Sequence, residues 1–489
     1  MSKQTDDFFK NIIGHAKEYG FVFPSSEIYD GLSAVYDYGQ LGSELKNNLK
    51  TYWWKSMVQL HENIVGIDAA IFMHPTTWKA SGHVDGFNDP MIDNKDSKKR
   101  YRADQLIEDK IDRYEKDGKT DKAAQLQQDL DAALNADDLA RLKTIIEDHN
   151  IVCPISGTKN WTDVRQFNLM FATQMGAMAD GAEQVYLRPE TAQGIFVNFL
   201  NVQKTGRMKI PFGIAQIGKA FRNEVIARQF IMRMREFEQM EMQFFVRPGS
   251  ELEWYSKWKE TRLKWHLALG SDPAKYRYHD HAKLAHYANA AVDIEFKFPF
   301  GFKEVEGIHS RTDFDLKQHQ AFSKKKMQYF DPEINQNYIP YVIETSIGLD
   351  RLFLTVLANS LVEEDLSTTD KQDSRVVLKF HPAIAPVKAA ILPLTKKDGL
   401  PEKAREIMTK LKFDFNVQYD EKDAIGKRYR RQDAIGTPFC ITVDYQTLTD
   451  NTVTIRHRDS MEQERVSAAD LDKIIGNLVS WTSLLEKLV

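Results

Sequence analysis

GIAQIGKAFRNEV (213–225) and FIMRMREFEQMEMQFFV (230–246) are the two stretches that most directly decide the fold of this chain. Both are typical of β-strands, and residues 226–229 between them suit a loop. With a period of two, one face of the second strand carries Arg233, Arg235, Phe237, Gln239, Glu241 and Gln243. The same parity in the first strand collects Gln216, Arg222 and Glu224. Two such neighbouring strands predict a polar floor with arginines at one end.

The arginines of this floor suit a phosphate ligand, because a guanidinium donates two parallel hydrogen bonds from one plane. Phe221 and Phe237 offer stacking surface for a purine ring. A β-hairpin with one wet face and ordinary surface ion pairs explains the same pattern about as well. The motif alone therefore leaves both interpretations open.

A second informative stretch is YVIETSIGLDRLFLTVL (341–357), an apolar strand that breaks at Gly348 and continues as an apolar helix. We expect glycine here to permit a tight turn. Arg351 falls in the first turn of that helix, where the positive end of the helix dipole favours an anionic ligand. The alternative is a buried arginine paired with Asp350 or Glu344.

Three acids have no lysine at helical spacing: Glu190 in YLRPETAQG (186–194), Glu241 and Glu344. Carboxylates that converge from separate strands suit an ammonium ion, which offers three donors and no acceptor.

FKEVEGIHSRTDFDL (302–316) adds two candidates. Glu304 is a candidate Mg²⁺ ligand through its carboxylate oxygens, and Arg311 is a candidate phosphate ligand. A surface acid that faces Lys303 explains Glu304 nearly as well.

Composition limits the class of protein. With 489 residues, of which 42% are hydrophobic, the chain is expected to form two or three domains. The net charge of −4 means that any nucleic acid must meet a local basic patch. Cys153 and Cys440 are the only cysteines, which excludes a disulfide framework and favours a reducing compartment. Without an apolar leader or a long apolar run, we expect a cytoplasmic chain with no membrane span.

The pattern along the chain also predicts its organisation. Residues 41–60 form an amphipathic helix, and an apolar stretch from Ile64 to Met73 reads as a strand that stops at Pro75. Residues 185–246 read as strands, and the polar stretch SLVEEDLSTTDKQDS (360–374) reads as a linker. The predicted domains are 1–93 and 151–365 of a catalytic unit, a charged helical insertion at 94–150, and an α/β module at 380–489.

Together these segments resemble the class II aminoacyl-tRNA synthetases, and among them the dimeric glycyl-tRNA synthetases. The helix and strand before Pro75 are similar to the first motif of that class, which forms the dimer interface. FRNE (221–224) with the following strand is similar to the second motif, and GLDR (348–351) to the third. The likeness covers essentially the whole chain through WKASGHVDGF (78–87), YRADQLIE (101–108), RQFNLMF (165–171), YLRPETAQGIFVNF (186–199), REFEQMEMQFF (235–245) and ETSIGLDR (344–351).

The resemblance implies an α+β fold, with an antiparallel-sheet catalytic domain, a helical insertion and a C-terminal α/β anticodon-binding domain. It implies a homodimer that uses ATP and Mg²⁺ to join glycine to tRNA(Gly), with Arg222 and Arg351 as catalytic residues. The implied ATP ligands, with Arg311 from its own pattern, are Arg222, Asn223, Glu224, Met232, Arg233, Met234, Arg235, Glu236, Phe237, Glu304, Val305, Arg311, Gly348, Leu349, Asp350 and Arg351. The implied glycine ligands are Arg102, Glu190, Phe237, Glu238, Gln239, Met240, Glu241, Glu344, Thr345, Ser346, Ile347 and Gly348.

The tail carries a basic stretch, IGKRYRRQDAIGTPFCITVD (425–444). Its cations suit an RNA backbone, and they are the predicted tRNA contacts: Lys427, Arg428, Arg430 and Arg431.

The chain departs from some bacterial relatives, which carry paired cysteines of a zinc knuckle beside the YRAD and RQFNLMF segments. Here DNKDSKKRYRAD (93–104) has no cysteine, and CPISG (153–157) has Ser156 where the second would fall. One thiol cannot hold tetrahedral zinc, so we expect no structural zinc and interpret Cys153 as a small buried hydrophobe.

Three other hypotheses remain at this stage: another class II synthetase, a non-catalytic relative that binds nucleic acid, and an oligomeric scaffold. The presence of Arg222, Glu224, Arg235 and Arg351 together favours an active enzyme.

Overall fold

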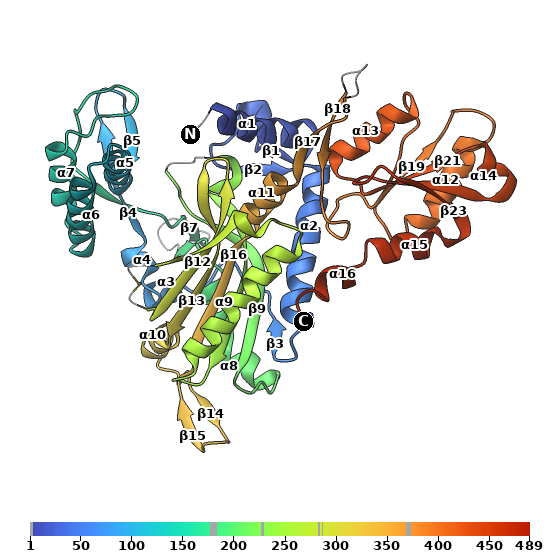
Figure 1. The fold of residues 1–489 in the computed structure, drawn as a ribbon. Coiled ribbons are helices and arrows are strands. Elements are labelled where there is room, and N and C mark those ends of the chain that lie inside the picture. The colour runs from blue at the N-terminus through green and yellow to red at the C-terminus, as the bar shows by residue number, and fades with distance from the viewer. Residues whose placement is uncertain (1–2, 177–182, 226–228, 282–283, 286, 368–372) are drawn as a thin grey trace.

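In the computed structural model, a sheet-bearing body lies between a helical unit and a C-terminal unit (Figure 1). The structure describes residues 3–176, 183–225, 229–281, 284–285, 287–367 and 373–489. Within these ranges no helix combines the length and the apolar character needed to cross a membrane. Most of the predicted loop 226–229 lies outside the described residues.

The body is built on a seven-stranded sheet in the order β11-β12-β13-β16-β10-β9-β3. The bounds are β11 (Tyr276–Asp280), β12 (Ala290–Phe298), β13 (Gly301–Thr312), β16 (Tyr341–Gly348), β10 (Glu236–Val246), β9 (Phe212–Phe221) and β3 (Ile64–Gly66). Every pairing is antiparallel except that of β3 with β9. The predicted neighbours β9 and β10 do pair, with Glu241 opposite Gln216. This antiparallel sheet confirms the predicted fold class.

The prediction of a strand from Ile64 to Met73 is wrong beyond Gly66. At the edge of the sheet the chain leaves the ladder, and the carbonyl of Ala69 instead accepts a hydrogen bond from the guanidinium of Arg188 at 2.8 Å. The helix α3 (Pro75–Ala80) then begins at Pro75.

Side chains alternate between the two faces of β10, and the two faces have different surroundings. Met240, Met242 and Phe244 pack into the main core, together with side chains of α2 (Gln40–Trp54), α9 (Glu251–Ala268) and α11 (Leu349–Ser360). Near the start of β10, the opposite face lines a cleft. At the far end of the strand, Phe245 packs under α8 (Ala192–Thr205).

The prediction that residues 185–246 are all strand is wrong for α8. Ile195, Phe196 and Phe199 follow helical spacing and are fully buried, so tertiary burial decides the state of a stretch rich in aromatic and β-branched residues.

The helical unit has its own core, which includes Ile92, Leu126, Ile146 and Trp161. It therefore extends beyond 94–150 on both sides. Its elements are β4 (Asn88–Asn94), β5 (Lys99–Arg102), α5 (Ala103–Lys116), α6 (Thr120–Asn135), α7 (Leu139–Asp148) and β6 (Arg165–Asn168). The three strands form one sheet in the order β5-β4-β6.

The C-terminal unit contains a five-stranded sheet in the order β20-β19-β21-β22-β23, with parallel and antiparallel pairs. Its elements are β19 (Ala389–Pro393), α12 (Leu400–Leu411), β20 (Val417–Tyr419), α13 (Ile425–Ile435), β21 (Phe439–Val443), α14 (Tyr445–Asp450), β22 (Thr452–His457), β23 (Gln463–Ser467), η6 (Ala468–Asp470) and α15 (Leu471–Leu478). The chain then returns to the body, where Leu484 of α16 (Thr482–Leu485) packs into the main core. The predicted α/β module is confirmed.

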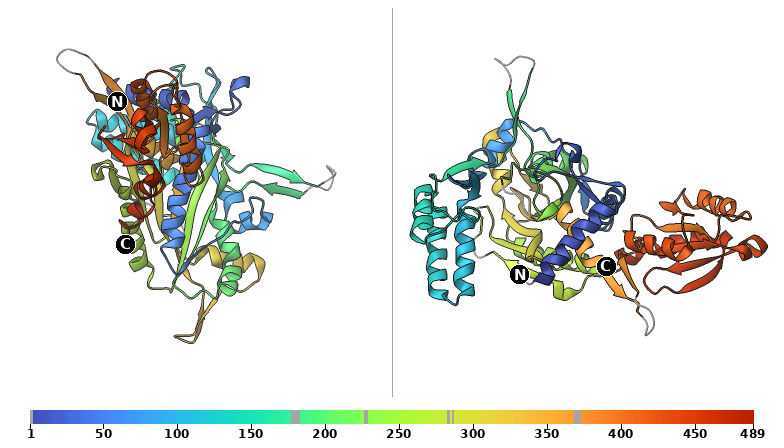
Figure 2. Two further views of the ribbon diagram at one scale, coloured as in Figure 1. Left: turned by 90° about the vertical axis from the view of Figure 1, so that its right-hand side faces the viewer. Right: turned by 90° about the horizontal axis from the view of Figure 1, so that it is seen from above.

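The stretch predicted as a linker pairs instead as a hairpin of β17 (Leu361–Asp365) and β18 (Ser374–Leu378). Viewed from above, the helical and C-terminal units again flank the body, and the hairpin of β7 (Ala172–Met175) and β8 (Glu183–Tyr186) projects from it (Figure 2).

The smaller elements complete the body. They are α1 (Lys3–Glu18), β1 (Val22–Pro24), η1 (Glu27–Tyr29), β2 (Tyr36–Tyr38), η2 (Lys55–Gln59), α4 (His83–Gly86), η4 (Phe230–Met232), η5 (Pro273–Lys275), α10 (Phe314–Ser323), β14 (Tyr329–Asp331) and β15 (Gln336–Tyr338).

One buried carboxylate on α11 is bonded by residues of three other elements, α2, β10 and β2. Asp350, in the first turn of α11, accepts hydrogen bonds from Lys46 Nζ of α2 at 2.8 Å and from the backbone N–H of Glu238 in β10 at 2.8 Å. The Tyr38 hydroxyl also donates to it. Because Asp350 is 2% exposed, it is held by these partners rather than by water.

We expect Asp350→Ala to lower the free energy of unfolding by about 3–5 kcal/mol, because the change leaves Lys46 partly uncompensated inside the protein. Denaturant unfolding of the full chain measures this.

The matched control is Glu253→Ala, which removes an exposed carboxylate paired with Lys257 on α9. It should cost less than about 1 kcal/mol. Equal losses in the two variants would contradict a central role for Asp350.

Candidate active site

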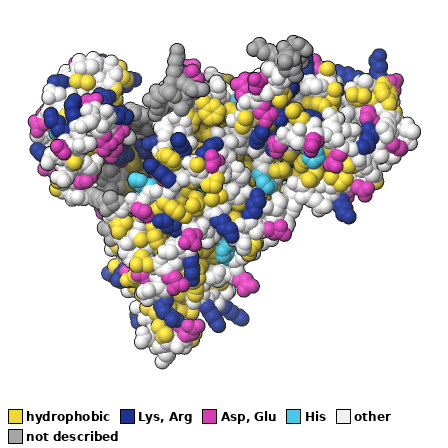
Figure 3. Space-filling model, in the orientation of Figure 1, with side chains coloured by type: hydrophobic (Ala, Val, Ile, Leu, Met, Phe, Trp, Pro, Cys, Tyr) yellow, Lys and Arg dark blue, Asp and Glu magenta, His cyan; other side chains and the backbone are white. Residues whose placement is uncertain are grey.

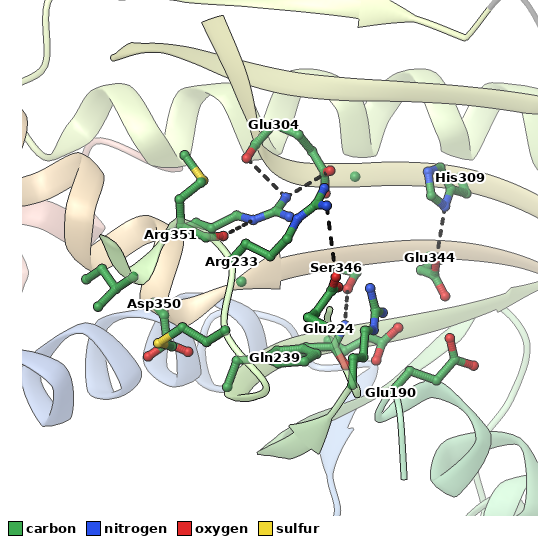
Figure 4. Close-up of a pocket in the computed structure, with 18 of the residues that line it drawn as sticks. Glu190, Glu224, Arg233, Gln239, Glu304, His309, Glu344, Ser346, Asp350 and Arg351 are labelled. Atoms are coloured by element: carbon green, nitrogen blue, oxygen red, sulfur yellow. Dashed lines mark hydrogen bonds and ion pairs between the residues drawn. The ribbon is translucent and has the colours of Figure 1, made fainter. Parts of the chain in front are cut away.

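A cleft lies on the face of the sheet that carries Phe237, Gln239 and Glu241, and it is closed at one side by the start of α11 (Figure 4). The structure brings most of the predicted site residues to its wall: Glu190, Arg222, Glu224, Met232, Arg233, Met234, Phe237, Gln239, Glu241, Glu304, Arg311, Glu344, Ser346, Gly348, Asp350 and Arg351. The strands predicted from alternation therefore do form one polar floor.

Arg351 lies at one end of the cleft, in the first turn of α11 as predicted. Its guanidinium pairs with Glu304 at 2.9 Å and does not pair with either predicted alternative, Asp350 or Glu344. Arg351 lowers the pKa of Glu304, against the effect of burial. Glu304 is an exposed acid, with 47% of its side chain accessible, but its ion pair is with Arg351 and not with Lys303. Gly348 has φ −74, so the turn before Arg351 does not require glycine.

Two further arginines share this end of the cleft. Arg222 donates through Nε to the carbonyl of Pro189 at 3.1 Å, and its guanidinium lies over the ring of Phe237 at 5.2 Å. Arg233 lies 3.9 Å from Glu224. Among the described residues, Arg222 forms no ion pair with a carboxylate. Its remaining donors are therefore suited to an anionic ligand.

The other end of the cleft holds the three predicted acids, as Figure 4 shows for Glu190 and Glu344. Glu344 accepts from Arg311 at 3.0 Å and Gln243 at 2.7 Å, and its second oxygen faces His309 at 3.0 Å. Thr191 donates to Glu241. The three acids therefore do converge, as predicted. Hydrogen bonds from neighbouring protein side chains hold them in place.

The environment divides the three acids by pKa. Burial, and then the charges of Glu344 and Glu190, raise the pKa of Glu241 well above its usual value. Burial alone would raise the pKa of Glu344 too, but Arg311 and His309 lower it below its usual value. His83 and Arg311 likewise overcome burial and lower the pKa of Glu190 to about 2. At neutral pH one acid thus favours its proton while two are ionised.

Strand alternation removes part of the implied site from the cleft. Glu238 pairs with Lys46 and Lys50 on the opposite face, and Met240 is in the main core. Thr345 and Ile347 of β16, Val305 of β13 and Leu349 of α11 are also buried and do not line the cleft. For these side chains the implied ligand role is not supported.

A β-bulge explains why Glu304 nevertheless faces the cleft. The register of β12 and β13 shifts at Ile294 and Glu295, so that Glu306 and Glu304 are opposite successive residues. The extra residue reverses the parity of β13, and Gly307, His309 and Arg311 line the cleft together with Glu304.

Other implied ligands lie outside the cleft lining. Arg102 pairs with Asp89 at 3.1 Å and Asp104 at 2.5 Å in the helical unit. Arg235 precedes the strand, and its guanidinium donates to the carbonyls of Glu224 and Ser33.

Three further implied residues have other local partners. The backbone N–H of Asn223 bonds to Leu169, and Glu236 pairs with Lys219. Arg311 was expected at a phosphate, but it lies at the acid end, where Asp315 pairs with it at 2.9 Å. Its guanidinium is thus used by two carboxylates.

Sequence reasoning missed four cleft residues: Ile231, Tyr287, Gly307 and His309. His309 shares the strand parity of Arg311, which would have been a usable signal. Tyr287 carries no such signal, because it lies in an irregular segment and stacks under Arg311 at 4.1 Å.

The predicted tRNA contacts lie on α13, and one of them, Arg428, is buried there. Its guanidinium is 2% exposed and donates to the carbonyl of Pro393 at 2.6 Å. Arg430 pairs with Asp373 and Arg431 with Asp420, whereas Lys427 is exposed. On the face shown in Figure 3, acidic and basic side chains of the C-terminal unit are interspersed.

Cys153 is buried as predicted, but its surroundings are polar. Its thiol lies 3.3 Å from Ser97 Oγ and 3.3 Å from the Tyr101 hydroxyl. Among the described residues, no cluster with metal-ligand spacing includes Cys153.

Family models match three parts of the chain. Residues 171–360 match the "tRNA synthetase class II core domain (G, H, P, S and T)", and residues 388–478 match the "Anticodon binding domain". Residues 89–125 and 118–169 match "Glycyl-tRNA synthetase insertion domain 1". The antiparallel sheet and its arginine-lined cleft are thus those of a class II aminoacyl-tRNA synthetase.

Curated relatives define the family more narrowly. The chain is 56% identical over 458 residues to the glycine–tRNA ligase of Chlorobaculum tepidum, covering 93% of this chain and 97% of that protein. It is 52% identical over 479 residues to that of Staphylococcus aureus, covering 97% and 99%. The chain belongs to the glycine–tRNA ligase family.

The opposite pKa shifts of Glu241 and Glu344 predict stability changes of opposite sign when each carboxylate is removed. Because the folded protein raises the pKa of Glu241 above 4.5, folding is disfavoured as pH rises through that range. We expect Glu241→Gln to gain stability relative to the parent chain between pH 5 and pH 8, as measured by denaturant unfolding.

Glu344→Gln is the matched variant, because the folded protein lowers the pKa of Glu344. The Glu344 carboxylate stabilises the fold above pH 4.5, and this stabilisation is lost as the pH falls below that value. The deficit of this variant should therefore be largest at pH 8. A change of the same sign in both variants would contradict the assignment.

Proposed function

We propose that this chain joins glycine to tRNA(Gly) in an ATP-dependent reaction of two steps. The observation that carries the proposal is the division of one cleft into an arginine end with Arg222 and Arg351 and an acid end with Glu190, Glu241 and Glu344. A triphosphate suits the first end and an ammonium group the second. Family membership supports the same substrates.

At the arginine end, Arg222 stabilises charge on the α-phosphate, and Arg351 holds the outer phosphates. Arg351 exchanges its pairing with Glu304 for a phosphate when ATP binds. Glu304 and Glu224 line this end, and their carboxylate oxygens are the ligands that Mg²⁺ prefers. A bound Mg²⁺ would supply charge neutralisation on the phosphates.

At the acid end, the ammonium group of glycine donates to Glu241, Glu344 and Glu190. The positive charge favours ionisation of Glu241, whose pKa is raised in the free protein. Arg311 holds Glu344 in place and does not contact the nucleotide. Ser346 lies between the ends, and we place it beside the α-carbon, where it limits space for a side chain.

The chemistry needs no protein nucleophile. The carboxylate of glycine attacks the α-phosphorus of ATP, and pyrophosphate leaves. The terminal ribose hydroxyl of tRNA then attacks the glycyl adenylate and releases AMP. The protein contributes position and charge stabilisation, as in other phosphate-transfer sites.

The C-terminal unit provides the tRNA contact in this proposal, through Lys427, Arg430 and Arg431 and without the buried Arg428. We also propose a homodimer that associates at the sheet edge formed by β3, which is one of the two edge strands. A cytoplasmic location is consistent with two free thiols, Cys153 and Cys440.

We expect Arg222→Ala to reduce glycine-dependent pyrophosphate exchange by about 10²–10³-fold, because a cation that stabilises charge in the transition state is lost. The far-UV circular dichroism spectrum should be unchanged.

The control is the triple variant with Lys427, Arg430 and Arg431 changed to Ala. It should keep the exchange rate while the KM for tRNA rises in aminoacylation. Near-normal exchange in a folded Arg222→Ala variant would contradict the proposed function.

A further inference from the structure

Three side chains with metal-ligand chemistry gather beside the acid end of the cleft: His281, Asp293 and His309. One ligand atom of each lies within 4.8 Å of the others, and His281 Nε2 lies 2.9 Å from Asp293 Oδ2. In the part of the chain that the structure describes, no other group of His, Cys, Asp or Glu has this spacing.

The register of three neighbouring strands brings these residues to one face. Asp293 is opposite Gly307, and His309 is opposite Ala291, so Asp293 and His309 point to the same side. The backbone N–H of His281 bonds to the carbonyl of Ala291 and extends the pairing of β11 with β12 by one residue. The cluster is therefore fixed by the sheet.

Gly307 keeps the space between the ligands open. A Cβ at this position would lie 3.2 Å from Nε2 of His309 and 3.5 Å from Oδ1 of Asp293. Any larger residue would thus crowd the point toward which two of the three ligands converge.

The imidazole of His309 is oriented as a metal ligand would be. Its Nδ1 lies 3.0 Å from Oε1 of Glu344, which as a carboxylate accepts the ring N–H. Its Nε2 is then an acceptor, and it is buried without a hydrogen-bond partner among the residues that the structure describes. Histidine ligands of metals commonly donate their other ring N–H to a carboxylate in this way.

We propose that His281, Asp293 and His309 bind a divalent metal ion of the zinc class. Two imidazole nitrogens and one carboxylate suit zinc, whereas Mg²⁺ prefers oxygen ligands alone. Bonds of about 2.1 Å place the ligand atoms of a tetrahedral site about 3.4 Å apart, so ligand atoms that now lie within 4.8 Å of one another must close by up to about 1.4 Å when the metal binds. Three protein ligands leave a fourth position for water on the side of the cleft.

The site also has a consequence for Glu344, and this part rests on the proposed function. A metal bound to Nε2 of His309 fixes the ring whose Nδ1 holds Oε1 of Glu344. His309 is then a positioning residue for the carboxylate that receives the ammonium group. The metal should lower the KM for glycine and leave the KM for ATP unchanged.

The test uses the full chain, without an affinity tag and stripped of metal with a chelator. Zinc binding is measured by competition with a chromophoric chelator, and the visible absorption of bound Co²⁺ reports the geometry. We expect one equivalent of tightly bound metal. Affinity should fall by at least about tenfold in His281→Ala and in Asp293→Ala.

The matched control is His279→Ala, because His279 is exposed on the same strand, 6.2 Å from the ring of His281, but outside the cluster. This variant should keep the site. Absence of a stoichiometric site, retention of it in folded His281→Ala and Asp293→Ala, or an equal loss in His279→Ala would overturn the proposal.

Pyrophosphate exchange then separates the two claims. A fall in the KM for glycine on zinc addition, present in the parent chain and absent in His281→Ala, supports the link to Glu344. Metal binding without that fall overturns the link and leaves the site. Metal binding in a chain with no glycine-dependent exchange leaves the site and overturns the proposed function.

Discussion

The carboxylate of Asp350 holds together the parts on which the cleft depends. It joins Lys46 of α2 and the backbone of β10 to the first turn of α11. Arg351 follows it directly, so the same contacts fix where the arginine end of the cleft begins. A buried charge held this way is costly unless every partner is present, which makes the local geometry nearly all-or-none.

Beyond the end of the cleft that Asp350 fixes, the strands of the sheet determine which side chains lie along the cleft floor. The alternation of β10 places Phe237, Gln239 and Glu241 along the floor, and β16 pairs with it so that Ser346 is opposite Glu241. Arg222, Arg233 and Arg351 lie at one end of the cleft beside Glu224 and Glu304, and Glu190, Glu241 and Glu344 lie at the other end beside Arg311. Arg311, whose pattern in the sequence suited a phosphate, instead neutralises Glu344 and allows three carboxylates to share a small volume. Charge separation across one cleft thus provides for two substrates of opposite charge.

The sequence predicted what alternation and helix starts control. The pairing of β9 with β10, the three convergent acids and the place of Arg351 follow from local patterns. Features that depend on tertiary contacts could not be predicted from the sequence. Arg428 is a buried hydrogen-bond donor, and Arg235 bonds to loop carbonyls before its strand begins. Within the implied glycine ligands on β10, alternate side chains point away from the cleft, as those of Glu238 and Met240 do. The bulge in β13, which brings Glu304 to the cleft, has no local signal in the sequence.

We propose above all that the acid end of the cleft binds a small ammonium group while the arginine end binds ATP. The most direct measurement is pyrophosphate exchange by the parent chain with glycine, alanine and N,N,N-trimethylglycine. Glycine should support exchange, and alanine should be at least about 100-fold poorer, because a closed pocket has no room for its methyl group. Trimethylglycine keeps the charge but has no N–H donor, so it should give no exchange. Comparable rates with either analogue would contradict the account.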